Sequence, residues 1–122
     1  MKLVVEESES EALDVHIARL PTVLVTSRIA MVEVSRAVKM VDPDEGAQVE
    51  ADRLLASCAL VELSPHLLRT ARGLTSRAVR SLDAIHLASA LRVAPDEFLC
   101  YDHRLSQAAA EHGLSQLAPG AA

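Results

Sequence analysis

The chain has 122 residues, half of them apolar, which fits one compact domain over residues 1–122 with a core large enough to fold alone. Phe98 and Tyr101 are its only aromatic residues, so it lacks the stacking platforms on which single-strand binders hold bases. The formal charge of -5 argues against a generally basic surface, although it leaves room for a local basic cluster.

The cysteines and the N-terminal residues indicate the cellular compartment of the protein. Cys58 and Cys100 are too few for a disulfide framework, and neither belongs to a C-x-x-C pair that would indicate zinc. We expect both to be small buried side chains in a reducing compartment. The opening residues MKLVVEESES hold only a short apolar run before acidic residues begin, which is typical of neither a signal peptide nor a membrane span. These features predict a cytoplasmic protein.

Apolar periodicity and helix-breaking residues divide the chain into alternating helices and strands. The capping-box pair Ser8 and Glu11 begins the first helix, and TVLVTS is a β-branched run typical of a strand buried on both faces. In chain order we predict a helix over 8–20, a strand over 22–27, helices over 28–41 and 43–57, a strand over 59–63, a helix from Pro65, a helix over 81–94 capped by Ser81, a strand over 97–101 and a helix over 102–113. This alternation indicates an α/β layered fold with a parallel sheet.

Three carboxylates are predicted to meet at one edge of that sheet. Strand ends and the starts of the following helices gather along the edge where α/β proteins bind ligands. Asp102 directly follows a strand, and Asp83 lies in the first turn of the helix that leads back to that strand. Glu33 borders an apolar stripe on its own helix and is predicted to point inward; the stripe consists of Ala30, Val34, Ala37 and Val38.

Converging carboxylates repel one another unless a cation lies among them. Oxygen ligands without cysteine favour Mg²⁺ or Mn²⁺ over zinc. We therefore predict a divalent metal site in which Glu33, Asp83 and Asp102 are both the ligands and the catalytic residues.

Each of these residues also has a purely structural interpretation. Asp83 can stabilise its helix through the helix dipole, and Asp102 can cap the helix that follows it. Glu33 can form a salt bridge with Arg36 or with a residue of another element. A hydrogen-bonded core histidine explains His86 better than a metal ligand does.

A run of arginines precedes Asp83 and consists of Arg69, Arg72, Arg77 and Arg80. Such runs are most often solvated surface. The position of this one, directly before a predicted metal ligand, raises the alternative that it guides a polyanion.

The segments TSRIAMVEVSRAV, RSLDAIHLASALR and CYDHRLSQAAAEHGL, in this order, resemble the PIN-domain family and specifically its VapC-type ribonuclease toxins. The resemblance covers essentially the whole chain. It implies a three-layer α/β/α domain, usually dimeric, that cleaves RNA with Mg²⁺ or Mn²⁺ held by four acidic residues. Glu33, Asp83 and Asp102 match the second, third and fourth of these acids.

The first acid has no counterpart in the printed chain. The family opens with a short central strand ending in a D-x-S-A-like motif, and we expect both the strand and its Asp to be missing here. Either the start codon lies upstream, or the chain is a catalytically inactive relative that binds an antitoxin or another protein. As printed, it is expected to be inactive or very weak. Cys100 is a smaller departure, since the family often has Thr or Ser there.

The resemblance implies the toxin of a type II toxin-antitoxin system, a metal-dependent endoribonuclease whose partners are RNA, a VapB-like antitoxin and a second copy of itself. Phosphate contacts are assigned to Arg77, Arg80 and Arg104. A different Mg²⁺-dependent phosphotransfer protein is disfavoured, because the sequence has no Gly-rich phosphate loop.

Overall fold

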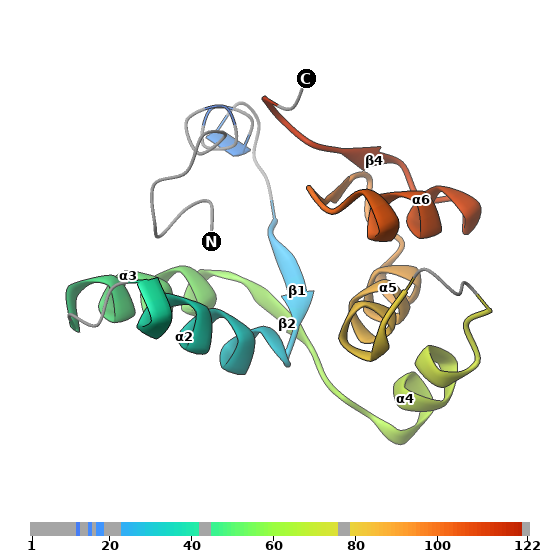
Figure 1. The fold of residues 1–122 in the computed structure, drawn as a ribbon, viewed down its shortest axis with the longest axis horizontal. Helices are drawn as coiled ribbons and strands as arrows, with labels where there is room; N and C mark the ends of the chain where they lie inside the picture. Colours follow the sequence, from blue (N-terminus) through green and yellow to red (C-terminus); the bar gives the residue numbers. More distant parts are fainter. Residues whose placement is uncertain are drawn as a thin grey trace. The chain divides into compact units, whose positions relative to one another are not determined.

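The computed structural model describes residues 12, 15, 17, 18, 23–41, 45–75 and 79–120 (Figure 1). They fall into two compact units. The N-terminal unit runs to Leu60 and includes the last residues from Pro119, and the C-terminal unit runs from Val61 to Ala118. Residues 12, 15, 17 and 18 are helical, as predicted, whereas the predicted capping box of Ser8 and Glu11 lies outside the described residues. That the chain forms a single domain stays a prediction.

The N-terminal unit contains a two-stranded sheet and a helical hairpin. Strand β1 (Val25–Ser27) pairs with β2 (Ala59–Val61), whose last residue belongs to the C-terminal unit. Helices α2 (Ala30–Val41) and α3 (Glu45–Ser57) pack against each other. Val38 and Ala51 are fully buried. The two predicted helices and both predicted strands are confirmed, although the strands are shorter than expected.

Fewer residues of this unit are buried than the sequence predicted. In β1 only Ser27 is buried, and Val25 is exposed, so the prediction of a strand buried on both faces is wrong for this strand. Among the described residues β2 is the one strand that pairs with β1. On α2 the buried residues are Ala30 and Val38, whereas Ala37 is exposed.

The C-terminal unit is built around one central helix. Its elements are α4 (Pro65–Arg72), α5 (Ser81–Val93), β3 (Phe98–Leu99), α6 (His103–Glu111) and β4 (Gln116–Leu117). One apolar cluster joins α5 to α6 and to the residue that follows β3, through Leu87, Leu105 and Cys100. A second joins α5 to α4 through Ala88 and Leu67. The predicted buried helix is therefore confirmed.

Strands β3 and β4 pair in parallel, with Phe98 opposite Gln116 and Leu99 opposite Leu117. The sequence did not predict β4, because two residues are too few to show a strand pattern. This pair, together with the alternation of helices and strands, confirms the predicted α/β class and short parallel sheet.

The first residues of α4 and α5 differ in how clearly the sequence predicts them. Ser64 caps α4, and its Oγ accepts a hydrogen bond of 3.1 Å from the backbone N–H of Leu67, with Pro65 as the first helical residue as predicted. The predicted Ser81 cap of α5 is wrong. Arg80 has the extended backbone of the cap residue, and its carbonyl accepts the first helical bond, from Ala84.

The two cysteines are free thiols in different surroundings. Cys100 is buried, as predicted, but Cys58 is only half-buried because it follows the end of α3. The Cys58 thiol donates a hydrogen bond of 3.3 Å to the carbonyl of Leu54. Partial burial raises the pKa of the Cys58 thiol, and its hydrogen bond with Ser57 offsets part of that rise.

In the part of the chain that the structure describes, no helix is long and apolar enough to cross a bilayer.

Candidate metal centre

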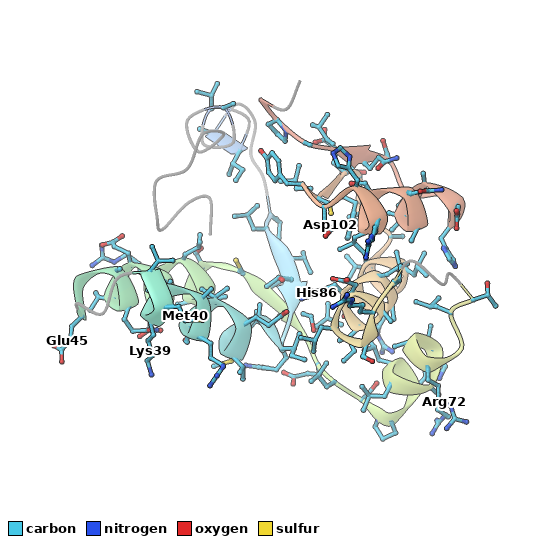
Figure 2. The ribbon with its side chains drawn as sticks, in the orientation of Figure 1. Lys39, Met40, Glu45, Arg72, His86 and Asp102 are labelled. Atoms are coloured by element: carbon cyan, nitrogen blue, oxygen red, sulfur yellow. The ribbon has the colours of Figure 1, made fainter. Side chains whose placement is uncertain are left out.

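Asp102 lies where β3 ends and α6 begins, and it is labelled at that junction in Figure 2. It is the N-cap of α6. Its Oδ1 accepts hydrogen bonds from the backbone N–H groups of Arg104, at 2.9 Å, and Leu105, at 3.1 Å. The structural interpretation of Asp102 as a cap is therefore confirmed. Because both bonds use Oδ1, the cap fixes the carboxylate and leaves Oδ2 outside these bonds, so capping and metal binding are compatible.

Two further side chains stabilise the turn that carries Asp102. The Cys100 thiol lies 3.4 Å from the backbone oxygen of Asp102, and the Ser106 hydroxyl lies 3.4 Å from the backbone oxygen of Cys100. Cys100 is the position where a hydroxyl was expected from the family resemblance. A thiol is a weaker donor, yet it reaches an acceptor in the same turn.

Asp83 is the third residue of α5 and is half-buried. A carboxylate in the first turn of a helix is stabilised by the positive end of the helix dipole, which agrees with its structural interpretation. Four residues on, Leu87 occupies the same helical face and belongs to the core cluster of Cys100 and Leu105. Those two residues flank Asp102 in sequence. One apolar cluster therefore anchors the segments that carry both acids.

Glu33 lies in the first turn of α2 and is half-buried, in the N-terminal unit. Asp83 and Asp102 belong to the C-terminal unit. That the three carboxylates meet stays a prediction. Taken unit by unit, the described residues contain no group of three His, Cys, Asp or Glu side chains that could hold a metal ion within one unit.

Sequence reasoning missed Ser27, which shapes the entry to the helix of Glu33. Ser27 is buried, and its Oγ accepts a hydrogen bond of 3.3 Å from the backbone N–H of Ile29, just before α2 begins. This contact bridges the turn between β1 and α2. A hydroxyl residue between an apolar run and a helix is a recognised signal for such a turn, and it could have been read from the sequence.

Of the three arginines predicted to contact RNA phosphates, the structure describes two. Arg80 is exposed at the start of α5, and Arg104 is exposed in the first turn of α6 next to Asp102. Arg77 lies outside the described residues. His86 was predicted to be a core histidine, and that prediction is wrong, because its side chain is only half-buried on α5 (Figure 2). The two described arginines are thus available to solvent beside Asp83 and Asp102, and their contact with RNA stays a prediction.

Comparison with known proteins identifies the family. The sequence model of the PIN-domain family matches residues 1–111 of the chain. Ribonuclease VapC46 of Mycobacterium tuberculosis (strain ATCC 25618 / H37Rv) is 38% identical over 122 residues, which cover 98% of this chain and 91% of the relative. Ribonuclease VapC35 of the same strain is 39% identical over 127 residues, covering 100% of this chain and 93% of the relative. No solved structure gives a significant match.

These matches cover nearly all of the chain and nearly all of the relatives. The chain belongs to the PIN-domain family and, within it, to the VapC type.

Proposed function

We propose that the protein is a metal-dependent endoribonuclease and the toxin of a type II toxin-antitoxin system. The observation that carries the proposal is its similarity, over 91% and 93% of their lengths, to two relatives named as VapC ribonucleases. The α/β fold and the carboxylates at the starts of α2, α5 and α6 support the same conclusion.

In this proposal Glu33, Asp83 and Asp102 hold Mg²⁺ or Mn²⁺. The donor set fits a hard divalent ion, because all three side chains offer carboxylate oxygen. Asp102 is well suited, since its cap uses Oδ1 only. When bound, the ion supplies Lewis-acid activation of water and of the scissile phosphate.

The protein's own residues prepare the site before any ion binds. The cap of α6 fixes the orientation of the Asp102 carboxylate, and the first turn of α5 holds Asp83 near the positive end of a helix dipole. Arg77, Arg80 and Arg104 are proposed to attract and orient the RNA backbone, whose charge makes such contacts favourable without reading sequence.

The proposed partners are RNA, a VapB-like antitoxin and a second copy of the chain, in the cytoplasm. The relatives' names support the ribonuclease and the VapC type, from which a paired antitoxin follows. The homodimer and the location are proposals that rest on the family resemblance.

The test is RNA cleavage by the protein expressed from its gene with the upstream codons left in place. We expect cleavage that needs Mg²⁺ or Mn²⁺, stops with EDTA, and is lost in Asp83→Asn and Asp102→Asn while both variants stay folded. A folded protein that binds no divalent metal and cuts no RNA would contradict the proposal and favour a non-catalytic module that binds an antitoxin.

A further inference from the structure

A polar contact joins α2 to α3, two helices that lie side by side in the N-terminal unit (Figure 1). The side-chain amide of Gln48, on α3, makes this contact. Its Nε2 donates a hydrogen bond of 3.1 Å to the hydroxyl of Ser35, on α2, and another of 3.0 Å to Oδ1 of Asp52, one turn further along α3. These three side chains form a polar bridge that runs from the exposed Asp52 to α2.

The other end of the Gln48 amide has no partner. Among the described residues, Gln48 Oε1 is the one buried side-chain nitrogen or oxygen without a hydrogen bond. Asp52 fixes the orientation of the amide, because the reversed amide would set its oxygen against the carboxylate. A buried acceptor without a donor is unfavourable, and an apolar side chain of the same length would avoid that penalty. The stability of the helix pair therefore does not by itself explain a glutamine at this position.

The apolar packing between α2 and α3 is too sparse to fix the rotation of α2 closely. Buried residues are few on these helices: Ala30 and Val38 on α2, and Ala51 on α3. Two of the three end in a single methyl group, so they offer little that interlocks. Hydrogen bonds are directional, and the bond between Gln48 and Ser35 therefore restricts rotation and sliding of α2 more closely than methyl contacts do.

The rotation of α2 matters because this helix carries Glu33. Glu33 lies two residues before Ser35, which corresponds to about 200° around a helix and a rise of about 3 Å. Glu33 therefore leaves α2 on the side opposite to Ser35, and the polar bridge supports the helix on its other side. A rotation of α2 by about 20° would move a carboxylate that is about 6 Å from the helix axis by about 2 Å.

We infer that Gln48 is a positioning residue, which through Ser35 holds α2 at the rotation that directs the Glu33 carboxylate to the metal ion. The inference rests on the proposed function, in which Glu33 is a metal ligand. Residues that support metal ligands directly change metal affinity by about 10–100-fold. Gln48 acts through a helix, so its removal should weaken metal binding less, by about three- to tenfold.

The test separates positioning from folding by replacing Gln48 with Met, which is of similar length and has no amide. Gln48→Met removes the bond to Ser35 together with the unpaired oxygen, so the midpoint of urea denaturation should stay the same or rise. Mn²⁺ affinity should fall about three- to tenfold, measured by electron paramagnetic resonance on the protein expressed with its upstream codons. Gln107→Met is the matched control, because Gln107 is exposed on α6, and it should leave Mn²⁺ affinity unchanged.

A second variant tests whether the effect passes through Ser35. Ser35→Ala removes the acceptor on α2 and leaves Gln48 its bond with Asp52. We expect it to weaken Mn²⁺ binding by a similar factor. The double variant Ser35→Ala/Gln48→Met should bind Mn²⁺ no more weakly than the weaker single variant, because both substitutions remove the same bond.

Unchanged Mn²⁺ affinity in Gln48→Met would overturn the inference and leave the proposed function intact. A fall in affinity together with a lower urea midpoint would also overturn it, because Gln48 would then have a purely structural role. Additive losses in the double variant would show that Gln48 does not act through Ser35. If the folded wild-type protein itself binds no Mn²⁺, the proposed function fails and the inference fails with it.

Discussion

The Cys100 thiol lies 3.4 Å from the backbone oxygen of Asp102, so a buried core residue contacts the backbone of a proposed metal ligand. Replacing it by Ala removes this contact and leaves a small void beside Leu87 and Leu105, and we expect a loss of about 1 kcal/mol in the free energy of unfolding. Hydrogen exchange of the Leu105 amide should become faster, because that amide bonds the Asp102 carboxylate. Cys100→Ser keeps a donor and should protect this amide better. Equal exchange in both variants would mean that the contact does not stabilise the turn.

Asp102 is predicted to have two roles that substitutions can separate. Asn caps helices about as well as Asp, so Asp102→Asn should change the free energy of unfolding by no more than about 0.5 kcal/mol, whereas Asp102→Ala should cost about 1 kcal/mol. Both substitutions should abolish the RNA cleavage that is expected of the protein expressed with its upstream codons. Urea denaturation and the cleavage assay check the two roles on the same preparations. An Asn variant that cleaves RNA at the wild-type rate would remove Asp102 from the proposed site.

The core of the C-terminal unit depends on Leu87, which is fully buried on α5. Leu87→Ala should lower the free energy of unfolding by about 3 kcal/mol, through lost transfer energy and a residual cavity. Leu82→Ala is the matched control, because Leu82 lies on the same helix with 47% of its surface exposed and should cost under about 1 kcal/mol. Similar losses in the two variants, measured by urea denaturation, would contradict the described packing of α5.

Cys58 predicts a pH effect on stability. Burial raises the pKa of its thiol above the ordinary value of a cysteine, despite the opposing hydrogen bond with Ser57. A group whose pKa is higher in the folded state contributes stability that is fully present below its unfolded pKa and is lost as the pH rises through its folded pKa. Between pH 8 and pH 10 the wild-type protein should therefore lose more stability than Cys58→Ala. An equal loss in the two proteins, measured by urea denaturation, would show that Cys58 does not contribute.

The sequence predicted elements whose signals are local and missed those that depend on distant partners. The long apolar pattern of α5 was sufficient to predict its burial, and Ser64 with Pro65 marked the start of α4 correctly. At Ser81 the same reasoning failed, because the cap position depends on where the backbone of the preceding loop becomes helical, one residue earlier. Strand β4 is defined by its pairing with β3, and its two residues are too few for the sequence to predict that pairing.

The candidate site was predictable to a similar degree. The order of strand, Asp102 and helix located that residue at a junction, and the structure adds which carboxylate oxygen makes the cap. The hydrogen bond from the Ile29 amide to the Ser27 hydroxyl was not predicted, although a hydroxyl residue before a helix is a signal for such a turn. The packing of Leu67 on α4 against Ala88 on α5 depends on how the two helices lie against each other, which sequence spacing alone does not reveal.

The binding of Mn²⁺ to the protein and its variants, followed by electron paramagnetic resonance, tests the central claim most directly. We expect Mn²⁺ to bind in a site that EDTA empties. Glu33→Gln, Asp83→Asn and Asp102→Asn should each weaken binding by more than about tenfold, since even residues that only contact metal ligands commonly contribute that much. Arg53→Gln is the control and should bind Mn²⁺ like the wild-type protein, because Arg53 is exposed on α3, where it pairs with Glu50 at 2.8 Å. A folded wild-type protein that binds no Mn²⁺, or three carboxylate variants that bind it with unchanged affinity, would contradict the proposed metal site.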